Sequence, residues 1–195
     1  MDASPPHAPK ASHSGAPLRS TTFSDVISLG AGRYRVQLGG SFGSAWLAVL
    51  CSELAARRIS IDQARAHRGH DGTWLAQLQV VVLSGAPDAE LVPYVELASA
   101  AMTRVPGPLS LDMHRVEQVP EHGGTLRLTI EGADSLGLLG SLLGSLATLM
   151  LFPVELRIET RRRRAFDTFW LAGVGGSVPS AQAHGALIRL LEGKA

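Results

Sequence analysis

The sequence Arg35-Val36-Gln37-Leu38-Gly39-Gly40 has a counterpart 92 residues later, Arg127-Leu128-Thr129-Ile130-Glu131-Gly132. In both versions apolar side chains alternate with polar ones, which is typical of a strand with one buried face, and glycine ends the run. Self-similarity at a fixed spacing indicates a repeated unit, and two copies of this size indicate a duplicated small domain. The same spacing relates Leu54-Ala55 to Leu146-Ala147, Arg65 to Arg157, and Trp74 to Phe166.

Each half of the chain reads as strand, helix, strand, strand and helix, with a further strand before the next unit. That order predicts an α+β fold of two ferredoxin-like (βαββαβ) modules, in which two helices cover one face of a four-stranded antiparallel sheet. The predicted strands are 34–38, 59–66, 74–83, 109–119, 125–130, 154–160 and 165–172, and the predicted helices are 44–58, 89–102, 136–150 and 180–191.

The predicted boundaries place the first module at 31–119 and the second at 120–195. Residues 1–21 are rich in proline, alanine and serine and lack an apolar run, which predicts a disordered tail. The second module has no strand after its last helix. We therefore expect strand 22–30 to complete the second sheet, since exposed sheet edges invite stray pairing.

Composition excludes several classes of protein. The 195 residues carry a net charge of +1, so no global field recruits nucleic acid or a membrane. The single cysteine, Cys51, excludes an internal disulfide framework and is predicted to be a small buried residue. The most apolar stretch, 136–152, is too short and glycine-rich for a membrane span, and its Gly137, Gly140 and Gly144 predict close approach of another backbone. No secretory signal is visible, and a cytoplasmic location is expected.

In the second half, Gly132-Ala133-Asp134-Ser135-Leu136-Gly137-Leu138-Leu139 precedes a predicted helix, and Ala165-Phe166-Asp167-Thr168-Phe169-Trp170 follows later. This arrangement resembles an ACT domain, most of all those at the C-terminus of nitrogen-regulatory uridylyltransferases. That family has an Asp-Arg-Pro-Gly-Leu-Leu segment and an Ala-x-Asp-x-Phe-aromatic strand. Here Ser135 and Leu136 replace the Arg-Pro pair, and the first-half segment Gly40-Ser41-Phe42-Gly43 keeps only the glycine. The tandem layout also resembles the glycine-cleavage transcriptional repressor, a stand-alone pair of ACT domains.

The resemblance implies binding of a small molecule, usually an amino acid, and regulation of a protein partner or of a homodimer. From the motifs that the sequence lacks, we expect no enzyme activity, no cofactor and no metal. A helix N-terminus offers free N–H groups to a carboxylate, and Asp134 can accept a hydrogen bond from an ammonium group. Alternatively, Asp134 caps the helix and Gly137 permits tight packing. The implied ligand-binding residues are Gly40, Gly43, Asp134, Ser135, Leu136, Gly137, Leu138 and Leu139.

Other polar clusters are predicted to be structural. His67, His70 and Asp71 lie at a hairpin turn, and zinc needs three or four converging ligands. The run Arg161–Arg164 predicts a solvated turn, with a grip on phosphate or an acidic partner as the alternative. No nucleophile elbow, phosphate loop or paired-metal motif is present. Trp46, Trp74 and Trp170 are predicted core or interface anchors.

Three hypotheses follow from the sequence. The first is a metabolite sensor that acts through a partner or through self-association. The second is a dimerisation or protein-interaction module whose ligand loops have decayed, which the substituted loops favour. The third is an enzyme or auxiliary factor that uses a cleft with convergent polar side chains, for which the sequence shows no motif.

Overall fold

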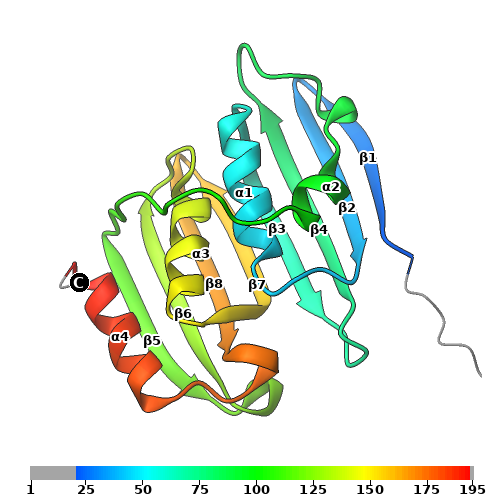
Figure 1. The fold of residues 1–195 in the computed structure, drawn as a ribbon. Coiled ribbons are helices and arrows are strands. Elements are labelled where there is room, and N and C mark those ends of the chain that lie inside the picture. Colours follow the sequence, from blue (N-terminus) through cyan, green and yellow to red (C-terminus); the bar gives the residue numbers. More distant parts are fainter. Residues whose placement is uncertain (1–20, 194–195) are drawn as a thin grey trace, which may run out of the picture.

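A computed structural model describes residues 21–193, so the predicted tail at 1–21 lies outside the described residues except for Thr21. Residues 21–193 form a single antiparallel sheet of eight strands, in the order β1-β2-β4-β3-β7-β8-β6-β5, with all helices on one face (Figure 1). The strands are β1 Phe23–Gly30, β2 Arg33–Gly40, β3 Ile59–Arg68, β4 Trp74–Val82, β5 Met113–Val119, β6 Thr125–Ala133, β7 Phe152–Arg161 and β8 Arg164–Ala172. The helices are α1 Trp46–Ala56, α2 Tyr94–Ser99, α3 Leu138–Thr148 and α4 Ala181–Leu191, with short 3-10 turns at Ala89–Leu91, Glu121–Gly123 and Val174–Gly176.

Strand β1 does not complete the second sheet, contrary to the prediction for residues 22–30. It forms a hairpin with β2, in which Val26 lies opposite Val36. Gly30 and Gly32 adopt positive φ angles at this turn, so the hairpin closes within three residues and pairs locally at small entropic cost. Strand β5 likewise pairs with β6 in the second module. Each module is therefore ββαββα, and the module boundary lies before β5 and not at residue 119.

The prediction of two separate four-stranded sheets is also wrong, because β3 and β7 join them. The two strands pair antiparallel over Gln63–His67 and Glu155–Glu159, and Arg65 lies directly opposite Arg157. These two arginines are the pair related by the 92-residue repeat, so a pseudo-twofold axis passes between them. Pairing satisfies backbone N–H and C=O groups that two separate modules would leave exposed at their edges.

The repeat relates Trp74 to Ala165 in space, and not to Phe166 as the sequence comparison suggested. Val36 pairs with Leu78 in the first module, whereas its counterpart Leu128 pairs with Phe169 in the second. The spacing between β4 and β8 is thus one residue shorter than between β2 and β6. Neighbouring residues of a strand face opposite sides of the sheet, so a shift of one residue places Trp74 and Phe166 on opposite faces. Trp74 is buried and faces the helices, whereas Phe166 lines the open face.

Helices α1 and α3 lie side by side above the β3–β7 junction (Figure 1). The prediction of a close backbone approach is confirmed at Gly140. A Cβ on Gly140 would lie 2.7 Å from Ser52 Oγ and 3.0 Å from Ser52 N, so only glycine permits this helix spacing. Helix α2 is shorter than predicted. Pro93 holds Val92 extended, so the helix cannot begin before Tyr94.

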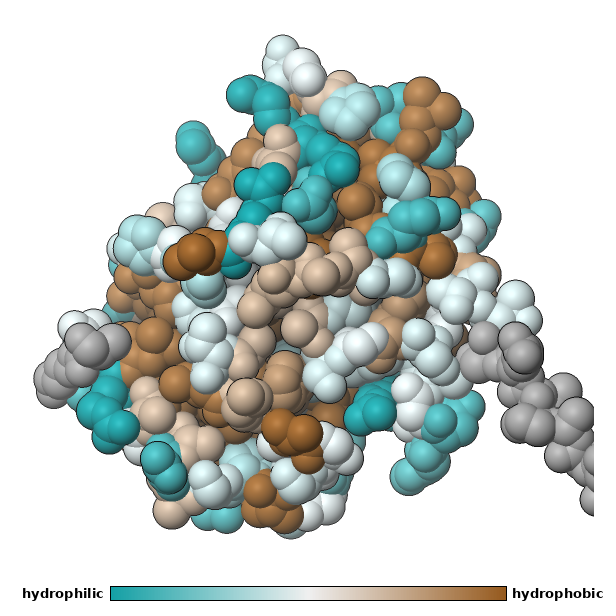
Figure 2. All heavy atoms as spheres, in the orientation of Figure 1, coloured by the Kyte–Doolittle hydropathy of each residue, from teal (hydrophilic) through white to brown (hydrophobic). Residues whose placement is uncertain are grey.

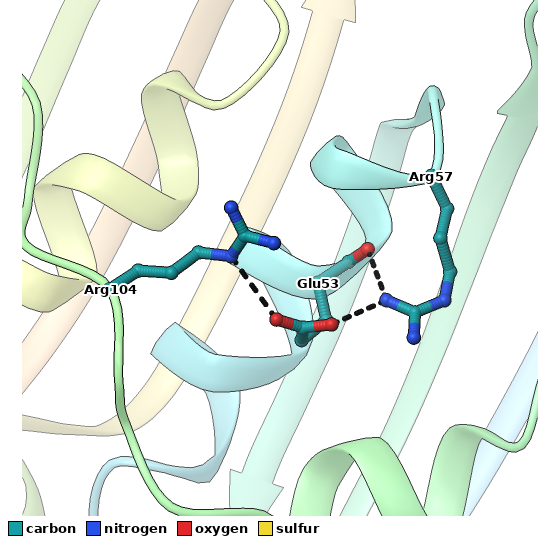
Figure 3. A network of polar contacts seen from close by, with 3 residues as sticks. All are labelled: Glu53, Arg57 and Arg104. Atoms are coloured by element: carbon teal, nitrogen blue, oxygen red, sulfur yellow. Dashed lines mark hydrogen bonds and ion pairs between the residues drawn. The ribbon is translucent and has the colours of Figure 1, made fainter.

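Residues 100–112, the strap, connect α2 to β5 across α1 and α3 (Figure 1). Arg104 Nε lies 3.1 Å from Glu53 Oε1, and Arg57 binds the other carboxylate oxygen of Glu53 (Figure 3). Further along, the N–H of Gly107 donates to Ser141 Oγ at 3.2 Å. The strap therefore fixes one helix of each module. On this helical side, polar and apolar side chains are interspersed (Figure 2). No described helix is long and apolar enough to cross a bilayer.

The substitution Gly140→Ala tests the α1–α3 contact. Alanine normally stabilises a helix interior by about 0.5–1 kcal/mol over glycine. At position 140 the added methyl group meets the backbone of Ser52, so we expect a loss of about 1–3 kcal/mol in the free energy of unfolding. Gly185→Ala in α4 is the matched control, since a Cβ there has only Arg189 Nη1 within 4 Å, at 3.6 Å. Urea unfolding should show opposite signs, and two stabilised variants would contradict the packing.

Candidate functional site

The predicted ligand loop of the second module, residues 134–139, connects β6 to α3. Gly137 takes φ 94° and forms the N-cap of α3, with no side chain capping the helix. Asp134 therefore does not cap α3. Its N–H donates to the carbonyl of Arg163, and its Oδ2 accepts a hydrogen bond from Thr160 Oγ1 at 3.1 Å. The loop carboxylate is thus held by the β7–β8 hairpin.

The space beside this loop is almost filled. A cavity of about 30 Å³ remains, which holds about one or two water molecules. An amino acid does not fit without movement of the loop. Cys51 is buried there as predicted, and burial raises the pKa of its thiol. The cavity is lined by Cys51, Ala55, Ile59, Ser60, Ile61, Asp134, Ser135, Leu136, Gly137, Leu139 and Gly140, whereas Leu138 is buried elsewhere.

The corresponding loop of the first module is closed as well. The Phe42 ring stacks on Trp46 at 5.0 Å between centroids, and the adjoining cavity measures about 20 Å³. Of the two predicted glycines, Gly40 packs against Thr22, where a Cβ would lie 2.8 Å from Thr22 Cγ2. Gly43 has open space where a Cβ would project. Strands β3 and β7, which join the two modules, are the seam strands. The loop of the second module lies beside the start of β3, and the loop of the first module lies beside the start of β7.

Asp167 is the buried acid of this region. It is 2% exposed on β8, and its Oδ1 accepts a hydrogen bond from the N–H of Glu159 at 3.3 Å. Burial raises the pKa of Asp167 to about 7, and the charge of Asp134 adds to that increase. Burial also raises the pKa of Asp62, although Arg33 Nη2 lies 2.8 Å from it. No group of His, Cys, Asp and Glu in residues 21–193 has the geometry of a metal site.

Asp167→Asn tests this burial through pH dependence. The folded state keeps a proton on Asp167 up to about pH 7, whereas an unfolded aspartate loses it near pH 4. The free energy of unfolding should therefore fall as pH rises from about 4 to 7, by up to about 1.4 kcal/mol per pH unit. The Asn variant should lack this slope and be more stable than the wild type at pH 8. Denaturant titrations across pH 4–8 with equal slopes for both proteins would contradict this account.

A much larger recess lies on the other side of the molecule, on the face of the sheet that no helix covers. It has a volume of about 810 Å³ and crosses six strands, from Phe23 on β1 to Thr168 on β8. This volume falls in the range of ligand sites in proteins. The centre of the recess is the Arg65–Arg157 pair at the pseudo-twofold axis. The polar side chains that line it are Gln37, Gln63, Arg65, His67, Gln77, Gln79, Arg157, Glu159 and Thr168, and the apolar ones include Phe23, Leu75 and Phe166.

The two halves of this open face differ in charge pairing. In the second module the arginines meet acids of the same chain, in the pairs Arg157–Glu155, Arg161–Glu159, Arg127–Glu117 and Arg164–Asp112. Hydrogen bonds from Arg161 hold the pKa of Glu159 below its usual range. In the first module the recess carries four glutamines, and Arg65 has no acid within 4.0 Å among the described residues.

The arginine run is a tight turn, as predicted. Arg162 and Arg163 have positive φ angles of 50° and 64°, which is the geometry of a two-residue type I′ hairpin. Arg161 and Arg164 pair with Glu159 and Asp112, so two of the four guanidinium groups are already neutralised. The turn therefore offers less free charge than the sequence suggests.

A second cavity of about 330 Å³ lies between α1, α2 and the strap. Its only acid is Glu53, which is bound by Arg57 and Arg104, and these hydrogen bonds lower the pKa of the carboxyl group. The charged groups of this cavity thus satisfy one another (Figure 3). It is better suited to holding the strap than to a polar ligand.

Comparison with known proteins does not identify a family or a function for this chain. No protein family matches the sequence, and no curated protein matches it either. One solved structure, a crystal structure of aspartate kinase from Synechocystis, is similar with a TM-score of 0.44 and 14% sequence identity. The similarity covers 83% of this chain and 27% of that chain, so this chain spans about a quarter of the kinase. A likeness this remote carries no functional argument.

Proposed function

We propose that this protein is a non-catalytic binding module that acts through a protein partner, whose acidic extended segment lies in the recess of the open sheet face. The observation that carries the proposal is the difference in cavity volume between the predicted ligand loops and the open sheet face. The two loops that the ACT resemblance implies as ligand sites adjoin about 30 and 20 Å³, whereas the open face offers about 810 Å³. This favours the interaction-module hypothesis over the metabolite sensor.

Charge complementarity identifies the partner as acidic. Arg65 and Arg157 are direct cross-strand neighbours, with Cβ atoms about 4.5–5.5 Å apart, and like charges in that position destabilise a sheet. A carboxylate between them removes this repulsion and accepts charge-assisted hydrogen bonds. Of these two arginines, Arg157 already forms an ion pair with Glu155, so Arg65 is the one whose guanidinium N–H groups can bind a carboxylate of the partner.

The glutamines explain why the partner is a peptide segment in extended form. An amide side chain both donates and accepts hydrogen bonds, as a peptide backbone does. Gln37 pairs with Gln77, and Gln77 pairs with Arg65, so these three side chains form one polar row that leads to the charged centre. Phe23 and Phe166 add apolar surface at the two ends. The lining contains no nucleophile paired with a base, which supports a non-catalytic role.

Arg65→Ala tests the recess directly. The probe is a labelled heptapeptide with three central glutamates and a leucine at each end, measured by fluorescence anisotropy. A charge-assisted hydrogen bond contributes about 1.5–3 kcal/mol, so we expect affinity to fall at least about tenfold in the variant. Arg115→Ala is the matched control, because Arg115 lies on the same face at β5, outside the recess.

Salt and sequence controls complete this experiment. Binding should weaken as ionic strength rises, since the contacts are between exposed charges. A heptapeptide with lysine in place of glutamate should not bind. Equal affinity for both peptides, or an Arg65→Ala variant that binds as tightly as the wild type, would show that the recess is not an acidic-peptide site.

Amino-acid sensing at residues 134–139 is the second candidate function, and one observation favours it. The N-terminus of α3 has no side-chain cap, so N–H groups of its first turn lack a side-chain acceptor and suit a carboxylate. The loop must open to admit the ligand. Calorimetry against the twenty proteinogenic amino acids separates the candidates. A sensor shows heat with one of them, abolished by Asp134→Ala, whereas the recess proposal predicts no heat at millimolar concentration.

A further inference from the structure

The outer edge of β1 presents unpaired backbone groups along a largely apolar strand. In residues 21–193, β1 pairs only with β2, so the N–H and C=O groups on its other side have no strand partner. Three large apolar side chains on it are exposed, Phe23 by 45%, Ile27 by 44% and Leu29 by 42%. Its only charge is Asp25, and it contains no lysine or proline. An edge of this kind is a template for pairing with another strand.

The opposite edge of the sheet is protected in the usual ways. Strand β5 carries Arg115 and Glu117, which form an ion pair with an N–O distance of 2.6 Å. Charged side chains of this kind blunt an exposed sheet edge. Pairing of β1 with β5 of another molecule would also repeat without closing and would give a filament, whereas pairing of β1 with itself closes a dimer.

We propose that β1 pairs antiparallel with β1 of a second copy of this chain, about a twofold axis at Val26. Residues that lie directly opposite each other in an antiparallel pair project from the same face of the sheet. In a pair of identical strands, the numbers of two opposite residues must therefore add to an even total. With Val26 opposite Val26, Asp25 lies opposite Ile27, and no like charges meet. The same register places Phe23 opposite Leu29, twice in the dimer, which pairs an aromatic with an apolar residue. The two eight-stranded sheets become one continuous sheet.

Phe23 is already held in position for this contact. A Cβ on Gly39 would lie 2.2 Å from Phe23 Cε1, so the ring rests directly on the backbone of β2 and needs little ordering on association. Phe23 also lines the open-face recess. Dimerisation through β1 therefore brings the recesses of the two copies together at their β1 ends. The dimer goes beyond the proposed peptide binding and does not depend on it.

Sedimentation equilibrium of the full chain tests the dimer. The wild type should sediment at twice the chain mass of 20.6 kDa at tens of micromolar. Leu29→Lys places a charge opposite Phe23 of the second copy and should give a monomer, and Ile27→Asp, which places a carboxylate opposite Asp25 twice in the dimer, should do the same. Met113→Lys is the matched control, since Met113 is a similarly exposed apolar residue at the β5 edge, and it should stay dimeric. Circular dichroism melts confirm that each variant is folded.

The register has its own test. Val26→Cys should form a disulfide-linked dimer under mild oxidation, because Val26 faces itself, whereas Ser24→Cys should not. The native Cys51 is buried and does not interfere. A monomeric wild type, a dimer that persists in folded Leu29→Lys, equal disruption by Met113→Lys, or crosslinking at Ser24→Cys in place of Val26→Cys would each overturn the proposal.

Discussion

The antiparallel pairing of β3 with β7 is the interaction on which the rest of the structure depends. Five register pairs join the two modules there, with Arg65 opposite Arg157 at the centre. The like charges cost about 0.2–1 kcal/mol, but each backbone hydrogen bond contributes on the order of 1 kcal/mol, so the backbone term is larger. On the helical face the same strands bury Ala64, Ala66, Leu156 and Ile158, which adds apolar stabilisation. The repulsion that remains lies on the open face, where an anion can relieve it.

The same junction determines which surfaces are available for function. It brings α1 against α3 at Gly140, and it seats each predicted ligand loop beside the seam strand of the other module. When the two modules pair to form the sheet, the joining strands therefore occupy the space beside the predicted ligand loops. The helix-free face stays uncovered and becomes a concave surface that draws residues from six strands. The open recess on that face and the closed loops on the other thus have one physical origin.

The sequence allowed prediction of what depends on local pattern. Alternation in Val36 and Leu38, the repeat that relates Arg65 to Arg157, and the close-packing role of Gly140 all follow from residue type and spacing. Edge-strand exchange was predicted wrongly for 22–30, because nothing in the alternation of a strand tells which neighbour it joins. The recess was missed, since Gln37, Gln77 and Arg65 come together only through sheet register and form no linear motif. The polar residues that alternate with apolar ones along these strands could have indicated the recess. The two arginines related by the repeat, Arg65 and Arg157, lie at the centre of that recess.

Hydrogen exchange of the backbone amides at the β3–β7 junction tests the account most directly. If the two modules form one sheet, amides within Gln63–His67 and Glu155–Glu159 that bond across the junction exchange as slowly as those in the central strands β4 and β8. If the modules are separate, β3 and β7 are edge strands, and these amides exchange as fast as the outward-facing amides of a bare edge. Slow exchange at the junction is the predicted result, and fast exchange there would contradict the single eight-stranded sheet and the recess built on it.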